Sequence, residues 1–303
     1  MSFSSDVKEE LARVFPRRKC CRKSELLGLI KASGSLRLDQ TTTSIDILAD
    51  SSLVARKAFL YVKHLYDAQP LILVRRSGRQ NYYKVRVTDE TFSKQVVQEI
   101  SGSESMSAES KRCCRRAFLR GLFLGAGFVS PPAKAHHLEI SVSDSATADM
   151  VIAMLDSFGV GAKMSRRKKG MFVYIKHGGD IADLLNVIGA HSCLLEYENV
   201  RAYKTMKSRV NRLVNMETAN LTKVARAALL QVSDIELIGE TVGLESLPES
   251  LQEIARLRLE HKEATLAELG KMSRDSLGKS GVNHRMRKIS EIARKVRESQ
   301  GIE

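Results

Sequence analysis

The chain has 303 residues, of which 43% are hydrophobic and 28% are charged. This composition is typical of globular proteins and argues against a disordered or membrane chain. Its 49 Lys and Arg residues outnumber 35 Asp and Glu residues, which gives a net charge of +14. No apolar run approaches the length of a membrane span, and a basic surface on such a chain favours nucleic acid as partner over a solvated face with none.

The start of the chain, MSFSSDVKEELARV, carries acidic residues early and has no apolar stretch of the kind found in signal peptides. The five cysteines are odd in number, and four of them form two adjacent pairs. This pattern favours a reducing compartment over a disulfide framework. We therefore expect a cytoplasmic protein without a membrane partner.

An internal repeat dominates the first two thirds of the chain. Residues 20–36, CCRKSELLGLIKASGSL, return 93 positions later at residues 113–129 as CCRRAFLRGLFLGAGFV, with seven identities in seventeen positions. Ordinary residue usage would give roughly one identity. The chain therefore contains two copies of one supersecondary unit, and we expect a pseudo-twofold structure. A duplicated fold with one saddle-shaped face would suit duplex nucleic acid as partner.

Both copies follow one predicted order of elements. In the first copy, Ile45 and Ile47 alternate with polar neighbours as in a strand, and residues 51–67 have the apolar spacing of a helix. The strand 137–143 matches the first strand at the offset of 93. A strand pair and a closing helix complete each copy. The predicted order is therefore helix, two strands, helix, two strands and helix, or αββαββα.

The domain organisation follows from this repeat and from shifts in composition. The Ser-rich segment 101–111 predicts a link between copies that cover about 20–100 and 113–195. The predicted fold is an α+β protein with a duplicated domain over 1–200, a helical basic linker over 201–220 and an all-α domain over 221–303.

The strand pairs carry basic residues at their turns. We expect these side chains to contact DNA phosphates without reading base sequence, although a solvated turn is the alternative. The candidates are Arg75, Arg76 and Arg79 in the first copy and Arg166, Arg167, Lys168 and Lys169 in the second.

The two repeated helices are apolar on nearly every side, so each must be buried. Gly28 and Gly121 would allow close backbone approach, and the closing Gly34 and Gly127 suit left-handed helix termini. The run LLGLIKASG, which ends at Gly34, resembles the LAGLIDADG motif of homing endonucleases, and the run that ends at Gly127 is a more degenerate copy. The resemblance implies two central helices under a saddle of antiparallel strands that sits over the DNA major groove.

In that family, one acidic residue before the last glycine of each motif holds divalent metal against the scissile phosphates. The corresponding positions are Ser33 and Ala126, and neither side chain can replace a carboxylate. The acid two places earlier is replaced by Lys31 and Leu124. We therefore expect no nuclease activity, no catalytic residue and no cofactor.

The C-terminal domain carries a helix-turn-helix pattern. Pro248 marks a helix start, and Thr265 with Glu268 forms a predicted capping box for a short second helix. A final helix, capped by Ser280, would bury a stripe of apolar residues and turn basic and polar residues outward. The stripe consists of Val282, Met286, Ile289 and either Ile292 or Ala293. The expected DNA-binding residues are Lys279, Ser280, Gly281, Asn283, His284, Arg285, Arg287 and Lys288.

The positive charge of the C-terminal domain is concentrated in its final helix. Residues 279–297 hold seven basic residues and one acidic residue, whereas residues 221–278 hold seven basic and ten acidic residues. The segment resembles region 4 of sigma factors, and its combination with a degenerate LAGLIDADG domain resembles the WhiA family of sporulation and cell-division regulators. The resemblance implies a nucleoid-associated, sequence-specific transcriptional regulator of cell division and chromosome segregation. Its partner would be double-stranded DNA, and other transcription or division proteins could bind as well.

The cysteines and histidines do not predict a metal site. Cys20-Cys21 and Cys113-Cys114 could be gathered by pseudo-symmetry, but adjacent cysteines rarely share one zinc ion and the usual C-x₂-C spacing is absent. Each pair is expected at the same end of its own helix. His136, His137 and His284 show no acidic partner at ligand spacing.

Two other classes of protein fit parts of this pattern. One is an active LAGLIDADG-type endonuclease, against which Ser33 and Ala126 argue. The other is a protein-interaction scaffold whose basic patches dock acidic partners. Cleavage of a plasmid with Mg²⁺ would identify the first, and binding to a defined promoter fragment over excess competitor DNA would exclude the second.

Overall fold

The computed structural model describes residues 2–38, 43–77, 80–101, 110–167 and 170–300. The chain forms two compact units, Met1–Thr205 and Met206–Glu303. No helix within the described residues combines the length and apolarity needed to cross a bilayer.

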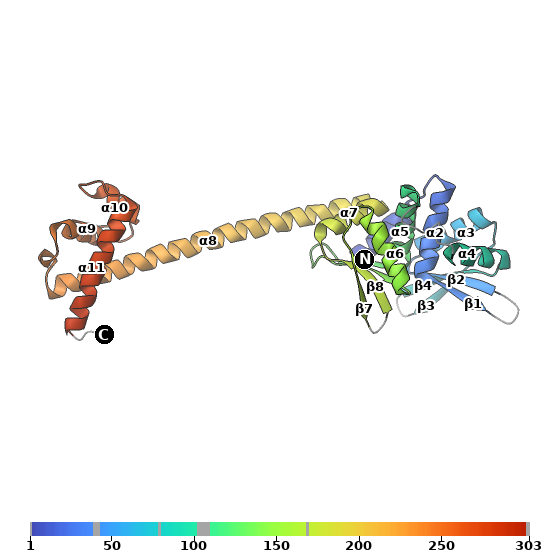
Figure 1. Ribbon diagram of the computed structural model, residues 1–303, viewed down its shortest axis with the longest axis horizontal. Helices are drawn as coiled ribbons and strands as arrows, with labels where there is room; N and C mark the ends of the chain where they lie inside the picture. Colours follow the sequence, from blue (N-terminus) through green and yellow to red (C-terminus); the bar gives the residue numbers. More distant parts are fainter. Residues whose placement is uncertain (1, 39–42, 78–79, 102–109, 168–169, 301–303) are drawn as a thin grey trace. The chain divides into compact units, whose positions relative to one another are not determined.

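Both copies of the repeat adopt the predicted αββαββα order, which confirms the α+β fold class (Figure 1). A short helix, α1 (Phe3–Arg13), precedes them. The first copy consists of α2 (Lys19–Ser33), β1 (Gly34–Leu38), β2 (Thr43–Ala49), α3 (Ser52–Tyr66), β3 (Leu71–Ser77), β4 (Gln80–Val87) and α4 (Glu90–Ser101). The second consists of α5 (Arg112–Ala126), β5 (Gly127–Val129), β6 (Leu138–Val142), α6 (Ser145–Asp156), β7 (Lys163–Arg167), β8 (Gly170–Ile175) and α7 (Gly178–Ile188).

Each copy forms one antiparallel four-stranded sheet. The strand orders are β1-β2-β4-β3 and β5-β6-β8-β7, which are equivalent under the repeat. Ile45 and Ile47 of β2 pack into the core with the helices. Because successive side chains of a strand point to opposite faces, Asp46 between them lies on the other face of the sheet. We call this face, in either copy, the outer face.

The helices α2 and α5 pack backbone to backbone at the centre of the first unit. A Cβ atom added at Gly28 would lie 2.3 Å from the carbonyl oxygen of Phe118, and one added at Gly121 would lie 2.0 Å from that of Glu25. Real Cβ atoms essentially never come within 3.0 Å of such atoms. Both positions therefore need glycine, and the predicted close approach of the two helices is confirmed.

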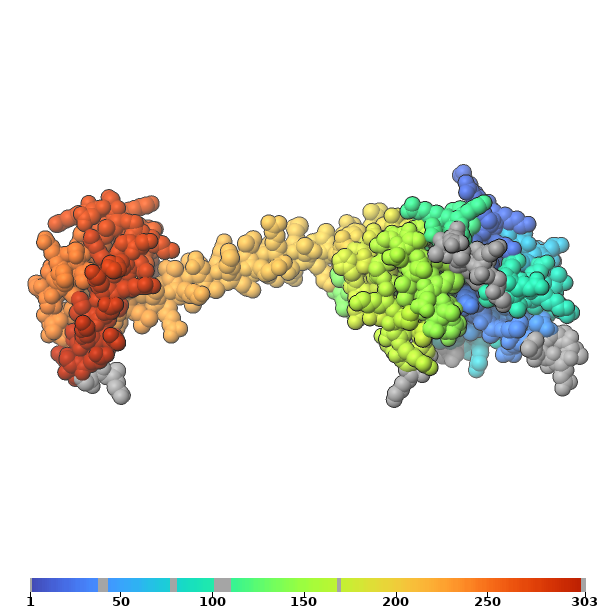
Figure 2. All heavy atoms as spheres, in the orientation of Figure 1, coloured from blue at the N-terminus to red at the C-terminus, as the bar shows by residue number. Residues whose placement is uncertain are grey.

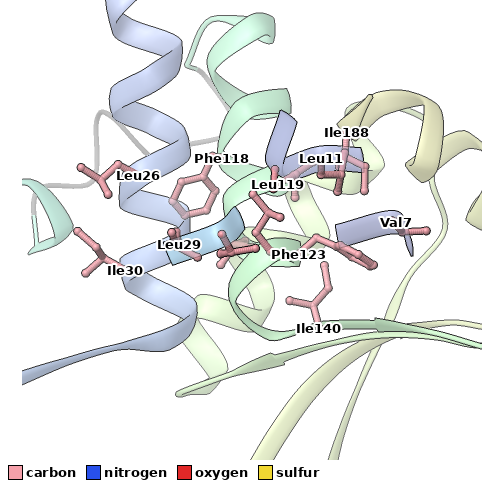
Figure 3. Packing of buried hydrophobic residues seen from close by; sticks show 14 of the residues in the cluster. Val7, Leu11, Leu26, Leu29, Ile30, Phe118, Leu119, Phe123, Ile140 and Ile188 are labelled. Atoms are coloured by element: carbon pink, nitrogen blue, oxygen red, sulfur yellow. The ribbon is translucent and has the colours of Figure 1, made fainter. Parts of the chain in front are cut away.

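One hydrophobic core spans both copies. Figure 3 shows side chains of α2 and α5 directed into a common cluster with Val7 of α1 and Ile140 of β6. Phe118, Leu119 and Phe123 of α5 are at most 1% exposed. Burying each such side chain contributes about 1.5–3 kcal/mol. The shared core holds the two copies together as one folding unit.

The predicted left-handed helix termini at Gly34 and Gly127 are wrong. Their φ angles are −81° and −79°, which is extended backbone, because α2 and α5 continue directly into β1 and β5. Glycine is required there for space instead. A Cβ at Gly34 would lie 2.4 Å from the Ile30 carbonyl oxygen, and one at Gly127 would lie 2.4 Å from a ring carbon of Phe123.

A buried ionic cluster connects α2, α3 and α5. The Glu25 side chain is 1% exposed and pairs with the equally buried Lys57, with Arg120 at 3.1 Å and with the Tyr61 hydroxyl at 3.1 Å. Lys57 also donates to the Leu11 carbonyl at 2.8 Å. Burial lowers the pKa of Lys57, while the Glu25 carboxylate raises it. The cluster fixes helices from both copies around one carboxylate.

The second unit is all-helical. The end of α8 (His191–Thr241) packs with η2 (Leu244–Ser246), α9 (Glu249–Glu260), α10 (Leu266–Met272) and α11 (Lys279–Gln300). Its core joins Ile235 and Ile238 of α8 to Ile254 of α9, Leu269 of α10 and Met286 of α11. Residues 201–220, expected to form a basic linker, are part of α8.

The start of α11 differs from the prediction. The helix begins at Lys279, and the backbone N–H groups of Gly281 and Val282 donate to the Gly278 carbonyl. Ser280 therefore lies inside the first turn and does not cap the helix. The predicted capping box of α10 is confirmed, since Thr265 and Glu268 exchange both hydrogen bonds.

Candidate nucleic-acid interface

The connection between α10 and α11 is held by internal hydrogen bonds. The Ser273 hydroxyl donates to the Gly270 carbonyl at 2.8 Å and accepts from the Leu277 backbone N–H at 3.2 Å. A Cβ at Gly270 would lie 2.0 Å from the Leu277 carbonyl oxygen, so no other residue fits there. The angle at which α11 leaves this connection is therefore set by the backbone.

A buried arginine braces the preceding connection. Arg258 of α9 is 1% exposed, and its Nη1 donates to the Ala264 carbonyl at 2.6 Å, with longer bonds to two neighbouring carbonyls. Burial lowers the pKa of Arg258. Neither Arg258 nor Ser273 was identified from the sequence, because a side chain that binds loop carbonyls leaves no periodic signal.

The helix α11 separates an apolar face from a polar one. Val282, Met286 and Ile289 are at most 2% exposed and pack into the core of the second unit. Figure 2 shows α11 at the surface of this unit, coloured red. The predicted site residues Lys279, Ser280, His284, Arg287 and Lys288 are exposed, and Gly281, Asn283 and Arg285 are partly buried.

Arg285 is engaged within the protein. Its Nη1 donates to the Ser250 carbonyl of α9 at 3.2 Å, and its Nη2 lies 3.3 Å from the Asp275 carboxylate. The side chain is 18% exposed. These bonds attach the start of α11 to α9 and to the connection before it. His284 and Arg287, which have no such bonds in the described part of the chain, project from the exposed face.

The basic residues of the strand pairs divide between the two faces of their sheets. Arg75 pairs with Tyr82 in register and lies on the outer face, whereas Arg76 lies on the helix side, and both are exposed. In the second copy, Arg167 lies on the outer face and Arg166 on the helix side. The remaining candidates, Arg79, Lys168 and Lys169, lie outside the described residues.

Two equivalent carboxylates lie on the outer faces. Asp46 is 1% exposed and accepts a bidentate pair of hydrogen bonds from Arg86 at 2.7 and 2.9 Å, with Arg37 and Lys84 within 3.2 Å. The hydrogen bonds from Arg86 lower the pKa of Asp46. Glu139, 93 residues later, lies 3.4 Å from Arg167. The outer faces are thus partly neutralised.

The sequence analysis did not identify these two carboxylates, although comparison of the two copies of the repeat could have done so. The matched strands place Asp46 and Glu139 at equivalent positions. Glu139 also lies 2.9 Å from His137, which corrects the expectation that this histidine lacks an acidic partner. Residues two apart in a strand share one face, so the two side chains meet. His136 instead bonds the Tyr197 hydroxyl at 2.7 Å.

The motif positions at the ends of the central helices lie close together. Ser33 is the last residue of α2 and Ala126 the last of α5. A Cβ at Gly125 would lie 3.1 Å from the Ser33 hydroxyl, which itself donates to the Leu29 carbonyl at 3.0 Å. Among the described residues, one group of potential metal ligands has side chains close enough to share an ion. It lies near the opposite ends of α2 and α5 and consists of cysteines.

Comparison with known proteins covers almost the whole chain. The family descriptions "WhiA N-terminal LAGLIDADG-like domain", "WhiA LAGLIDADG-like domain" and "WhiA C-terminal HTH domain" match residues 19–101, 115–207 and 210–293. A protein of Alkaliphilus oremlandii named "Probable cell division protein WhiA" is 43% identical over 317 aligned positions, which cover 99% of each chain.

Solved structures agree with this match. The crystal structure of a full-length WhiA protein from Thermotoga maritima is 32% identical, with a TM-score of 0.60, and covers 97% of this chain and 99% of that one. The crystal structure of the N-terminal LAGLIDADG domain of a WhiA protein is 28% identical, with a TM-score of 0.52, and covers 62% of this chain and 90% of that one.

Proposed function

Because this chain belongs to the WhiA family, we propose that it is a sequence-specific DNA-binding transcription regulator that acts in cell division. Regulation of chromosome segregation or sporulation is the finer form of the proposal. The similarity to a relative named "Probable cell division protein WhiA" supports a role in cell division. The helix-turn-helix geometry of α10 and α11 supports the binding of double-stranded DNA, and the proposed place of action is the cytoplasm, at the nucleoid.

The observation that carries the proposal is the division of α11 into a buried and an exposed face. A recognition helix must be held rigidly by its apolar side while polar side chains near its N-terminus reach the base edges. Val282 and Met286 supply the anchor. His284, Arg287 and Lys288 are exposed within the first three turns, as base contacts require.

We assign distinct roles to the other predicted residues. Lys279, Ser280 and Gly281, at the start of α11, would lie against a phosphate, because the first N–H groups of a helix, here those of Lys279 and Ser280, and its positive potential attract an anion. Asn283 would contact a base edge, and Arg285 would orient α11 through its bonds to Ser250 and Asp275. Sequence-independent phosphate contacts are assigned to Arg75, Arg76, Arg79, Arg166, Arg167, Lys168 and Lys169.

The proposed regulator is not a nuclease. Ser33 and Ala126 occupy the positions at which the LAGLIDADG resemblance calls for carboxylates. A hydroxyl that is already bonded to the Leu29 carbonyl and a methyl group offer no site for a catalytic divalent ion. Incubation of supercoiled plasmid with the protein and Mg²⁺ should leave the plasmid uncut, and nicking that disappears in the Ser33→Ala variant would contradict this part.

The test of DNA recognition compares two basic residues of one helix. Operator fragments are first found by footprinting the full chain on genomic DNA. Arg287→Ala should then lose about 1–3 kcal/mol of affinity for the operator but much less for random DNA. Arg294→Ala, an exposed control more than a turn further along α11, should affect both DNAs equally and weakly. Equal losses on both DNAs for Arg287→Ala would refute base reading by α11.

A further inference from the structure

Four cysteines of the two copies meet at one end of the central helices. Cys20 and Cys21 lie in the first turn of α2, and Cys113 and Cys114 lie in the first turn of α5. The Sγ atoms of Cys20, Cys21 and Cys114 all lie within 4.8 Å of one another. Cys113 is not part of this 4.8 Å group, although its thiol lies close enough to those of Cys21 and Cys114 to affect its pKa. The parallel packing of α2 and α5 therefore gathers both pairs.

We propose that this thiol cluster is a binding site for one thiophilic divalent cation of the zinc class, held by Cys20, Cys21 and Cys114 with Cys113 as the fourth ligand. A tetrahedral zinc ion with Zn–S bonds of about 2.3 Å places its sulfurs about 3.8 Å apart. The three grouped thiols need to contract by about 1 Å or less to reach that geometry. Such a change is within the reach of side-chain rotation.

The spacing rule that argued against a metal does not apply to this arrangement. Adjacent cysteines rarely share a tetrahedral ion because most backbones direct them apart. Here Cys20 and Cys21 stand in the first turn of a helix, and their sulfurs both approach that of Cys114 across the helix pair. The donor set is thus drawn from two helices, and no C-x₂-C loop is needed to assemble it.

Burial raises the pKa of the Cys21 and Cys114 thiols, so these groups would lose their protons on binding the ion. The helix ends would then stabilise the bound thiolates. The N-caps of α2 and α5, Arg18 and Lys111, make no side-chain capping bond, so both helix starts lack a side-chain acceptor. Thiolates at these ends would gain from the helix dipoles and from nearby cations. Arg18 already donates to the Cys113 sulfur at 3.9 Å. Four thiolates around one divalent ion keep a negative charge, which such surroundings accommodate.

The site suits a structural ion. Cys21 and Cys114 are 5% and 8% exposed, while Cys20 is exposed and gives the ion a route of entry. Four protein ligands would leave no open position for a substrate or a catalytic water. Ser33 and Ala126 lie at the other ends of the same helices. The ion would connect the two copies of the repeat at a point where no covalent bond joins them.

The experiment measures metal content and coordination on the full chain, purified under reducing conditions without chelator. We expect about one zinc ion per chain by mass spectrometry. After zinc is removed, added Co²⁺ should develop the intense visible bands of tetrahedral thiolate coordination. Added Zn²⁺ should raise the melting temperature of the metal-free protein. These three readouts do not depend on DNA binding, so they fail or succeed separately from the proposed function.

Variants identify the ligands. Cys20→Ser, at an exposed position, should leave the fold intact by circular dichroism yet weaken Zn²⁺ binding by more than about 100-fold. Cys114→Ser should do the same if it folds. Cys193→Ser, which removes the one remaining cysteine, a buried thiol of α8, is the matched control and should bind like wild type. Three results would overturn the proposal. They are a metal content below about one tenth of an equivalent, equal Zn²⁺ binding by the Cys20 and Cys193 variants, and a disulfide between these thiols without metal uptake.

Discussion

Adding one methyl group at Gly121 is expected to force the two central helices apart. The new Cβ would lie 2.0 Å from the Glu25 carbonyl oxygen and 2.8 Å from the Leu29 backbone nitrogen. Both neighbours are backbone atoms, so no side-chain rotation can relieve the overlap. Ordinary Cβ contacts begin at 3.4 Å, and the helices must separate by about 1.4 Å, the difference from 2.0 Å, to restore one.

The cost of this separation can be bounded. Overpacked cores usually lose about 1–3 kcal/mol, and a gap of even 0.5–1 Å forfeits a quarter to a half of each dispersion contact along its length. The helix pair buries side chains such as Leu26, Leu122 and Phe118 over several turns. We therefore expect Gly121→Ala to destabilise the protein by about 3 kcal/mol or more, at the upper end of the usual range.

The measurement is urea unfolding of the full chain, followed by circular dichroism, together with hydrogen exchange resolved by mass spectrometry. Exchange should rise in peptides of α2 and α5 but not in those of α10 and α11. The control is Gly239→Ala in α8, where the Cβ would meet only Leu244 side-chain atoms at 3.7 Å or more. That variant should gain up to about 1 kcal/mol from helix propensity.

Gly28→Ala provides an internal check through the repeat. Its Cβ would lie 2.3 Å from the Phe118 carbonyl oxygen, so a loss of similar size is expected. If Gly121→Ala and Gly28→Ala were both as stable as wild type, with unchanged exchange in α2 and α5, the backbone contact between the helices would be refuted. The pseudo-twofold core would then need another explanation.

Two further predictions concern charged residues. Lys57→Met should cost about 3–5 kcal/mol in urea unfolding because it leaves Glu25 buried with less compensation, and the double variant with Glu25→Gln should recover part of this loss; additive losses would refute the coupling. Asp144 caps α6, and hydrogen bonds from Ser143 and the Thr147 backbone lower its pKa from 3.8 to about 2. The Asp144 carboxylate therefore adds to the free energy of unfolding above its unfolded-state pKa, and this addition is lost as pH falls from about 4 towards 2. Asp144→Ala should cost about 1 kcal/mol near neutrality and progressively less between those pH values. Melting curves recorded across this pH range check the trend, and Asp144→Asn, which keeps a capping oxygen, should stay close to wild type.

Much of the fold was predictable because the repeat is encoded in apolar spacing. The order αββαββα and the glycine contact between the helices follow from residues 20–36 and 113–129. For Gly34 and Gly127, the sequence analysis correctly singled out the glycines but gave the wrong structural reason for them. Sequence shows that a glycine is present, but whether it serves a positive φ or a lack of space depends on the neighbour it meets, which for Gly34 is its own preceding turn.

The candidate interface was predictable only in outline. The periodicity of α11 separates Met286 from Arg287, but it cannot show that Arg285 turns back to Ser250 and Asp275. Partners that lie far apart in sequence carry no periodic signal. The same holds for the thiol cluster, since the pairing of α2 with α5 in space brings Cys20 to Cys114.

The partners of Asp46 bear on how the proposed regulator divides its work. Three cations of the first outer face, Arg37, Lys84 and Arg86, already pair with this buried carboxylate, and each would have to leave it to bind a phosphate with full charge. Phosphate binding by this sheet therefore competes with an internal ion pair, whereas Arg287 and Lys288 of α11 are exposed and have no ion pair within the described part of the chain. Asp46→Asn keeps the shape of the side chain and removes the competing charge. In the proposed function this variant should tighten binding to random DNA and steepen its salt dependence, while the ratio of operator to random affinity falls. Unchanged affinity for random DNA would mean that the outer face of the first copy does not meet the duplex, and phosphate binding by the first unit would then rest on the second copy alone.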